Sequence, residues 1–446
     1  MKMALVSLLL VLGFAGPAFA DDERIGELER KVEALTAEIE NIQLGAVADT
    51  TARARTAGRF GLAPAASKVY GAGPGVSIGG YGEALYENFD RSREDDVPSG
   101  KLDRLDHLRQ VVYLGYKFTD RLLFNSEIEL EHGGVRDEAL VEGRADPLTG
   151  EVQGSAELSG EVSLEFAYID WLLRPGVGVR AGMMLLPLGL VNELHEPPIF
   201  LGARRPDVEQ VIIPTTWSAN GIGIHGRGRG LEYRLFLTEG LNARGFSASQ
   251  GIREGRQNGS QSLATRGAVA ARLDYVGFPG LTAGAAAFTG DSWQDFQPAG
   301  AEVTPRLTLF DLHSRLQWRG LTLSGLYAHG ALTDVSDLSD ALGLTGSDRL
   351  GKSFFGGYVE GAYDVAPLLA PAAEWGLAPY ARLERYDTQE DVPGGAEDPA
   401  NRRSVITAGV AFKPHPQVVL KTDRQWRHDE ADTATDQWNV ALGYLF

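Results

Sequence analysis

The ionisable residues best suited to chemistry gather in one proline-rich stretch, residues 187–216. They are three acids, two arginines and a histidine, namely Glu193, His195, Arg204, Arg205, Asp207 and Glu209. Such a mixture can attract ions, and charge rings of this kind tune ion preference in pores. The alternative is a set of salt bridges that hold the stretch in place, and for any single residue it is at least as well supported.

Catalytic and cofactor motifs do not fit the chain. Gly221–Gly226 matches GxGxxG, but it lies within an expected strand and opens no helix. His195 and Glu196 lack the second histidine of a zinc-protease helix, and prolines follow them. Neither a GxSxG elbow nor a phosphate-binding loop is found, and the eight histidines have no metal spacing. We therefore predict no catalytic residue, no cofactor and no metal.

The composition of the chain excludes some classes of binding partner and some kinds of chemistry. The formal net charge of -18 argues against a nucleic-acid partner. Cysteine is absent, which removes thiol catalysis, disulfides and thiolate metal sites.

The elements that must position these residues are strands. From Val76 onward, apolar and polar residues alternate in segments of about ten residues, and no later segment nears 18 consecutive apolar residues. The predicted strands are 76–89, 107–118, 121–131, 157–173, 176–186, 217–227, 231–238, 266–276, 281–290, 306–318, 321–331, 353–365, 377–387, 404–413, 417–426 and 435–446. Sixteen is an even number, as bacterial single-chain barrels have.

The connections between these strands alternate in length. Tight turns such as 119–120 and 319–320 follow the even-numbered strands, and long polar loops follow the odd-numbered ones. The exception is 366–376, a long connection on the short side. Short turns at one end and long loops at the other are typical of outer-membrane barrels.

The fold class predicted is therefore all-β, a transmembrane antiparallel β-barrel of about 16 strands with its apolar face towards lipid. Aromatic residues near strand ends suit interfacial girdles, and they include Phe89, Phe118, Trp318, Tyr363, Trp426 and Trp438. The last strand is the most regular, and its aromatic face gives a predicted assembly signal of Trp438, Tyr444 and Phe446.

The opposite face of each strand should line a lumen of mixed charge. The expected wall residues are Arg109, Glu127, Glu129, Arg180, Arg227, Arg234, Arg272, Arg315 and Arg382, with Glu161, Glu165 and Glu232. Opposite charges on facing walls would set a transverse field. Residues 187–216 contain five prolines, which forbid regular sheet, yet they also carry Leu, Ile, Val and Phe. We expect this third long loop to fold into the lumen as a constriction.

The N-terminal region divides into three parts. Residues 1–20 have the charge, apolar core and Ala18-Phe19-Ala20 site of a signal peptide. Residues 21–44 form a predicted periplasmic coiled coil, and residues 45–75 a linker. The heptad positions are Ile25, Leu28, Val32, Leu35, Ile39 and Ile42. β-Branched residues at a with mostly leucine at d favour two strands, so a trimer does not follow from the heptad.

Taken together, these features resemble a trimeric bacterial outer-membrane porin, and residues 187–217 are most similar to the phosphate-selective porin superfamily. The architectural resemblance covers most of the chain, and the motif resemblance only that loop and the terminal strand. It implies a trimer in the outer membrane of a Gram-negative bacterium, in contact with lipid. It also implies passive diffusion of small hydrophilic solutes or ions past the third loop. Anion preference is not carried over, because lysine is scarce and the chain is acidic.

Two alternatives remain. In the first, the coiled coil contacts the cell wall and tethers the outer membrane to it, and the pore is incidental. In the second, the barrel is a lipase or protease, which needs a Ser/His or Asp/His cluster on one rim. No such cluster can be assembled from the strand ends.

Overall fold

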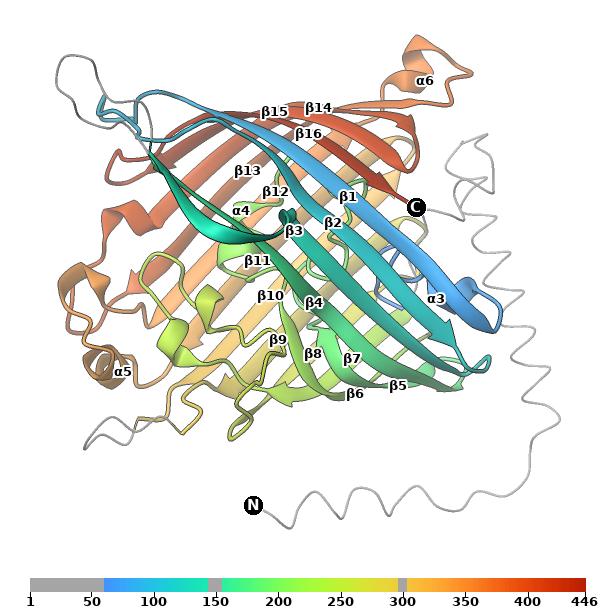
Figure 1. Cartoon of the computed structure of the whole chain (residues 1–446), viewed down its shortest axis with the longest axis horizontal. Helices are drawn as coiled ribbons and strands as arrows, with labels where there is room; N and C mark the ends of the chain where they lie inside the picture. The colour runs from blue at the N-terminus through green and yellow to red at the C-terminus, as the bar shows by residue number, and fades with distance from the viewer. Residues whose placement is uncertain (1–59, 143–154, 296–302) are drawn as a thin grey trace. The chain divides into compact units, whose positions relative to one another are not determined.

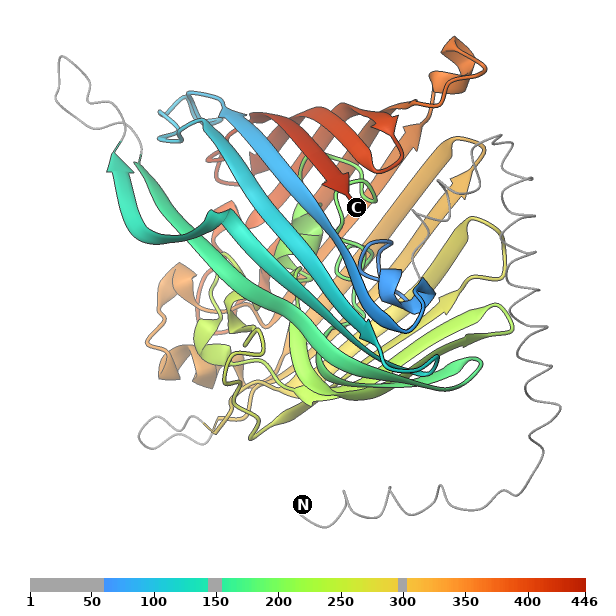
Figure 2. The same ribbon diagram turned by 45° about the vertical axis from the view of Figure 1, so that its right-hand side comes forward.

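The computed structural model describes residues 60–142, 155–295 and 303–446. Within this part of the chain, sixteen antiparallel strands form a closed barrel in which each strand pairs with the next (Figures 1 and 2). Strand β16 (Gln437–Leu445) pairs with β1 (Gly75–Phe89) and closes the ring. The predicted fold class, an all-β barrel of sixteen strands, is confirmed. The predicted signal peptide, the predicted coiled coil and the first part of the predicted linker lie outside the described residues.

The remaining strands follow the predicted order. They are β2 (Arg104–Lys117), β3 (Leu122–Glu142), β4 (Ser155–Arg174), β5 (Val177–Leu185), β6 (Ser218–Gly228), β7 (Leu231–Glu239), β8 (Gly267–Tyr275), β9 (Leu281–Asp291), β10 (Arg306–Trp318), β11 (Leu321–Leu332), β12 (Ser353–Tyr363), β13 (Gly376–Asp391), β14 (Arg402–His415) and β15 (Val418–Asp429). The largest difference is β3, which runs eleven residues past its predicted end at 131. Apolar alternation stops there, but backbone pairing with β4 continues because it needs no apolar side chain.

The two ends of the barrel differ, as the connection lengths predicted. At the turn end, Arg229-Gly230 and Arg319-Gly320 both have positive φ, which matches the type I′ turn of two-residue hairpins. The exceptional long connection there contains α6 (Ala366–Leu369). The long-loop end carries α5 (Val335–Ala341) and the short helices η1 (Ala243–Gly245), η2 (Arg253–Gly255), η3 (Gly346–Asp348) and η4 (Pro399–Asn401). Among the described residues, no helix is both long and apolar enough to cross a membrane.

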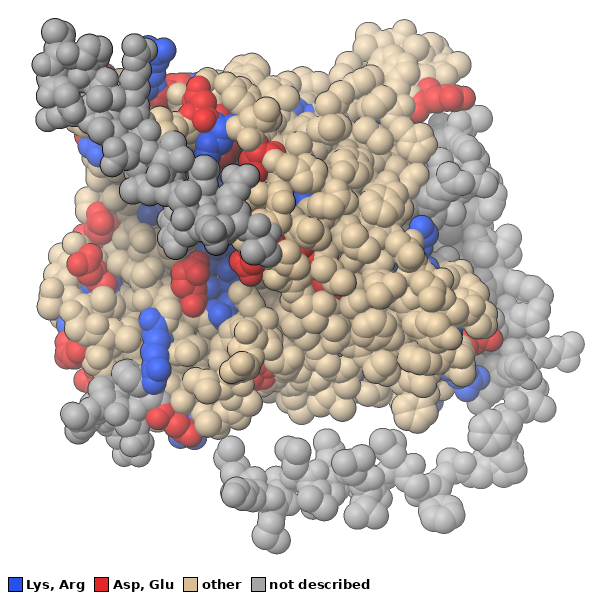
Figure 3. Space-filling model, viewed as in Figure 1, with Lys and Arg blue, Asp and Glu red and all other residues tan. Residues whose placement is uncertain are grey.

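The outer surface of the barrel is apolar. Leu312 is 56% exposed and Leu383 53%, although both are large hydrophobic residues within strands. In Figure 3 the charged side chains gather towards the end that carries α5, and few lie on the rest of the face. Five of the six expected girdle aromatics are exposed, namely Phe118, Trp318, Tyr363, Trp426 and Trp438. Phe89 differs: it is only 9% exposed, because the outward side chains of β1 are at even positions, such as Ile78 and Tyr86.

The N-terminal segment, residues 60–72, packs inside the turn end of the barrel. It contains α3 (Lys68–Gly71), and Leu62, Ala66 and Val69 are all at most 2% exposed. The backbone oxygens of Ala66 and Ala72 accept hydrogen bonds from Asn125 on β3 (2.8 Å) and Lys117 on β2 (2.8 Å). The last part of the stretch predicted as a linker is therefore packed chain. Its small alanines allow close approach to the wall, a feature that composition alone does not distinguish from a loose connection.

Candidate functional site

The third loop, residues 187–216, crosses the lumen. Hydrogen bonds and ion pairs join it to nine strands, β1, β3, β7, β8, β10, β12, β13, β14 and β15. For example, Gly189 N donates to Asp311 (3.1 Å), Lys413 Nζ donates to the Pro198 oxygen (2.7 Å), and Ala203 N donates to Asp423 (2.7 Å). The loop is therefore held around most of the circumference.

Apolar packing explains why the loop lies inside. Leu188, Val208, Ile212 and Ile213 are all at most 2% exposed and belong to the main hydrophobic core. The short helix α4 (Asp207–Val211) presents Val208 to this core. Burying such side chains is favourable by roughly 1.5–3 kcal/mol each.

Several of the predicted loop residues hold the loop to the wall. His195 Nε2 lies 3.0 Å from Glu127 Oε1, and Glu193 lies 3.3 Å from the guanidinium of Arg234. Glu209 accepts hydrogen bonds from the Tyr358 hydroxyl (2.5 Å) and from the backbone amides of residues 190 and 191 (2.9 and 2.6 Å). These contacts match the structural alternative for Glu193, His195 and Glu209.

The second half of the loop is held in the same way. The carboxylate of Asp207 pairs with Arg427 and accepts a hydrogen bond from Tyr386 (3.1 Å). Arg204 pairs with Glu87 on β1. Of the six predicted loop residues, Arg205 alone lacks an ion pair or a close hydrogen bond among the described residues. Its Nη1 lies 3.4 Å from the Thr216 hydroxyl.

Asn192 is a residue that sequence reasoning missed. Its Nδ2 donates to the backbone oxygens of Leu186 (2.7 Å) and Trp217 (3.1 Å), and its Oδ1 accepts from Trp217 N (2.7 Å). It thus joins the two residues that flank the loop on either side. A neutral amide in a charged stretch carries no charge signal, so only its position within the proline-rich stretch could have drawn attention to it.

Most predicted wall residues face inward and are paired. Arg180 lies 3.1 Å from Asp170, Arg272 lies 2.7 Å from Asp274, and Arg382 lies 2.7 Å from Glu384. Arg234 pairs with Glu232 and with Asp274, while Arg315 donates to the Ile199 oxygen of the loop (2.7 Å). Arg227 has the inward phase but lies exposed at the turn end of β6. Breaking a buried pair of this kind typically costs 3–5 kcal/mol, so these arginines act first as supports.

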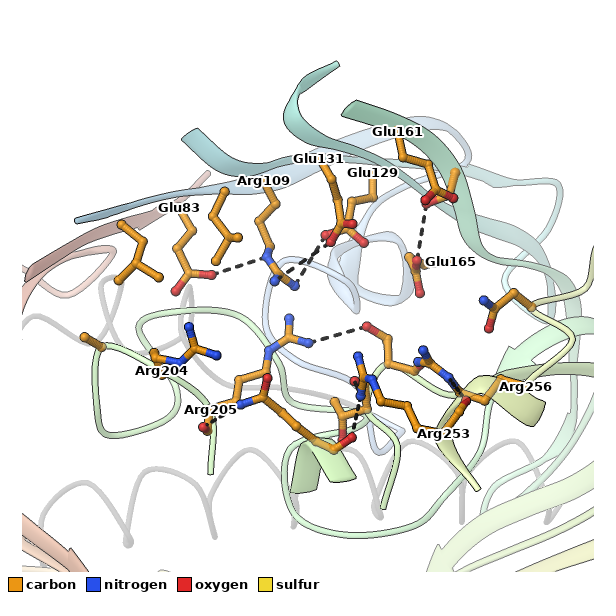
Figure 4. Close-up of a pocket in the computed structure, with 18 residues that line it drawn as sticks. Glu83, Arg109, Glu129, Glu131, Glu161, Glu165, Arg204, Arg205, Arg253 and Arg256 are labelled. Atoms are coloured by element: carbon orange, nitrogen blue, oxygen red, sulfur yellow. Dashed lines mark hydrogen bonds and ion pairs between the residues drawn. The ribbon is translucent and has the colours of Figure 1, made fainter. Parts of the chain in front are cut away.

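The remaining predicted residues meet in one cavity of about 230 Å³ (Figure 4). Its acidic side comes from strands β1 to β4 and carries Glu83, Glu129, Glu131, Glu161 and Glu165 around Arg109. Its basic side carries Arg204 and Arg205 from the third loop and Arg253 and Arg256 from the loop between β7 and β8. The cavity therefore lies between opposite charges, as a transverse field requires.

The acidic side has too few cations for its carboxylates. Arg109 lies 3.4 Å from Glu83, 3.4 Å from Glu129 and 3.9 Å from Glu131. Among the described residues, no ion pair joins Glu161 or Glu165 to a basic group. Glu165 Oε1 accepts a hydrogen bond from the Ser163 hydroxyl (3.3 Å).

The basic side is fixed by backbone carbonyls. Arg253 Nη1 donates to the Thr215 oxygen (3.1 Å), and Arg256 Nη1 donates to the Pro214 oxygen (3.0 Å). Burial, and then the charge of nearby Arg256, lower the pKa of Arg253 to about 10, so the Arg253 guanidinium remains cationic at neutral pH. Sequence reasoning missed this pair, because a polar loop has no period that shows which side chains turn inward.

One other cluster of side chains has oxygen and nitrogen atoms that could coordinate a metal cation. Glu94, His428 and Asp432 lie at the long-loop end, with ligand atoms all within 4.8 Å of one another. His428 Nδ1 is 2.9 Å from Glu94. All three residues are exposed, and exposed acidic groups of this kind are common without a metal. Glu94 lies more than 300 positions from His428 and Asp432, which explains why no spacing rule found the group.

Comparison with known proteins gives one relative and a set of similar folds. No family model matches the chain. Among solved structures, a loop-deletion mutant of OmpT, an outer membrane protein of Vibrio cholerae, has a TM-score of 0.51 at 8% identity, covering 83% of this chain and 99% of that one. OmpF of Salmonella typhi, in complex with daunomycin, has a TM-score of 0.50 at 12% identity, covering 83% and 97%. At such identities the likeness shows the outer-membrane barrel fold.

The relative is a protein of Aquifex aeolicus (strain VF5) that is described only as uncharacterized. It is 37% identical over 397 residues, which are 86% of this chain and 83% of that protein. The aligned region is long enough to take in most of the barrel. The chain therefore belongs to the same family as this Aquifex aeolicus protein.

Proposed function

We propose that the protein is a porin of a Gram-negative outer membrane, through which small hydrophilic solutes or ions diffuse down their gradients without catalysis. The observation that carries this proposal is the cavity between the acidic wall and the arginines of the third loop, inside a barrel whose exterior is apolar. A charge-lined cavity within a lipid-facing barrel suits the passage of polar solutes.

The third loop acts as the constriction, and the charges on either side of the cavity set ion preference. Glu87 neutralises Arg204, so Arg205 is the principal loop charge facing the acidic wall. We place the chain beside the phosphate-selective porin superfamily on the resemblance of this loop. We do not extend an anion preference to it, because five carboxylates line the same cavity.

The terminal strand supports assembly. Phe446 N donates to the Gly80 oxygen (2.9 Å), and Gly80 N donates to the Phe446 oxygen (3.0 Å), so the last residue closes the barrel onto β1. Trp438 and Phe446 are each 45% exposed on the outer face. We propose that three such barrels associate in the membrane.

A structural role is the second candidate, and one observation favours it. The third loop and the N-terminal segment together bond to twelve of the sixteen strands, because the segment adds contacts to β2, β4 and β5. Much of the lumen is therefore occupied. A barrel braced in this way would suit a tether between the membrane and the cell wall through the predicted coiled coil.

Single-channel recording of the purified full chain in a planar bilayer separates the two candidates. The porin proposal predicts stepwise openings in groups of three, with a reversal potential in a salt gradient. A folded barrel that inserts without any conductance would reject the porin proposal. Loss of envelope integrity on deletion of residues 21–44, with solute flux unchanged, would then support the tether.

A further inference from the structure

Arg205 is a buried cation with unused donors. It is 7% exposed, and its Nε and Nη2 have no hydrogen-bond partner among the described residues. Leaving a buried charged group without hydrogen-bond partners is unfavourable. The side chain lines the cavity, and Figure 4 shows it on the side opposite the glutamates.

The two unused nitrogens share one edge of the guanidinium. Nε and Nη2 point their hydrogens in parallel, which is the arrangement that binds both oxygens of a carboxylate or phosphate. The third nitrogen, Nη1, is turned towards the Thr216 hydroxyl (3.4 Å) and leaves that edge free. Arg253 and Arg256 add positive charge on the same side of the cavity.

The facing wall favours the opposite charge. Glu161 and Glu165 line the cavity without forming an ion pair to a basic group among the described residues, and Glu129 and Glu131 share Arg109. A simple anion at Arg205 would be repelled by these carboxylates. A simple cation at Glu161 and Glu165 would likewise be repelled by the arginines. A molecule with both charges, held apart, satisfies both sides at once.

We propose that this cavity is a saturable binding site for a small organic zwitterion, with its carboxylate on the free edge of Arg205 and its ammonium group near Glu161 and Glu165. The proposal rests on the proposed function in that it places the site on the path of the diffusing solute. The volume of about 230 Å³ is below the ~300–1,000 Å³ typical of pockets for drug-sized ligands, so the zwitterion is small.

The proposal is tested by measuring equilibrium binding to the purified full chain in detergent. Saturation-transfer NMR detects the bound probe. The probes are ω-amino acids from glycine to 6-aminohexanoate, with butyrate, butylamine and inorganic phosphate as matched single charges. We expect the best amino acid to bind at least tenfold more tightly than butyrate, butylamine or phosphate. Equal or tighter binding of butyrate or phosphate would overturn the proposal and leave an anion site.

Two variants test which side chains bind the carboxylate and the ammonium group of the amino acid. Arg205→Gln should weaken binding of the best amino acid about tenfold, while Arg306→Gln, an exposed arginine paired with Asp291 on β9, should leave it unchanged. Glu161→Gln, at an exposed position, should weaken binding of the amino acid but not of butyrate. If Arg205→Gln does not fold, the Glu161→Gln variant decides. The site is rejected if this variant binds the amino acid and butyrate with equally reduced affinity, or if it binds both as tightly as the wild type does.

The result is separable from that for the proposed function, because binding in detergent does not require conduction. Conductance without amino-acid binding leaves the porin in place and rejects the zwitterion site. Binding without conductance supports the site and rejects the porin.

Discussion

Glu196 on the third loop accepts hydrogen bonds from the backbone amides of Ala65 (3.2 Å) and Ala66 (2.9 Å), about 130 positions earlier in the chain. A third bond, from Ala63 N to the backbone oxygen of Glu193 (3.2 Å), joins the same two segments. The N-terminal segment and the third loop are thus one packed unit inside the barrel. A substitution at this contact should therefore destabilise both segments.

Glu196 should make barrel stability depend on pH. Burial, opposed by the two backbone donors and Tyr113 and reinforced by the charge of Glu127, raises the pKa of Glu196 to about 8. The ordinary value is 4.5, so the folded state holds a proton that the unfolded state releases. The contribution of Glu196 is most favourable below about pH 4.5 and is lost as pH rises towards 8. Thermal unfolding in detergent from pH 5 to 8.5 measures it.

Glu196→Gln is the control for that slope. The amide cannot titrate, so the variant should be less stable overall but should lose less stability than the wild type as pH rises. An identical pH slope in both proteins would show that Glu196 does not carry the effect.

Tyr70 should anchor the N-terminal segment. Its hydroxyl donates to Asp170 Oδ2 (2.6 Å), and Arg180 donates to the same hydroxyl (3.1 Å). Tyr70→Phe removes both bonds and should lower the free energy of unfolding by about 1–3 kcal/mol. Tyr233→Phe is a matched control, because that hydroxyl is part of an exposed contact to the Gly176 oxygen (3.0 Å). Equal losses in the two variants would contradict an anchoring role for Tyr70.

Arg204 and Arg205 should influence ion preference. Replacing both with alanine leaves Glu87 with only the longer ion pair to Arg104 (3.6 Å) and removes the loop charges that face the acidic wall. The ratio of cation to anion permeability should rise about twofold or more, read as a shift of reversal potential in a potassium chloride gradient. Arg306→Ala, at an exposed position, should shift it far less. An unchanged potential in the double variant would leave the two arginines with a structural role alone.

Phe446 should be needed for assembly. Deleting it removes both of its backbone bonds to Gly80, so the yield of the proposed trimer should fall severalfold. Phe446→Leu keeps these bonds and an apolar outer face, and should assemble better than the deletion. The amount of heat-resistant oligomer on a gel measures the difference. Normal yield from the deletion would remove Phe446 from the assembly signal.

The sequence predicted the strands better than the lumen. Alternation and turn chemistry located all sixteen strands, because a barrel in lipid requires a regular apolar exterior. The same alternation of apolar and polar residues placed Arg180, Arg382 and Glu127 on the inner face of the barrel. Pairing within the lumen could not be predicted in this way. The contact between Arg234 and Glu193, or between Asp207 and Arg427, depends on how the third loop folds.

The residues that line the cavity could also be predicted only in part from the sequence. Arg109, Glu129 and Arg205 were predicted from phase and position, but Arg253 and Arg256 come from a loop without periodicity. Residues 60–72 carry small and apolar residues that suit a linker as well as a packed segment. Only tertiary contacts distinguish the two.

The most direct test asks whether solutes pass through the cavity. The chain has no cysteine, so Ser163→Cys places a single thiol in the cavity lining. Ser347→Cys places one on an exposed loop away from the cavity. The account predicts that a bulky thiol reagent sharply lowers the single-channel conductance of the Ser163→Cys protein and leaves the Ser347→Cys protein unchanged. Full conductance after complete modification of Cys at position 163 would contradict it.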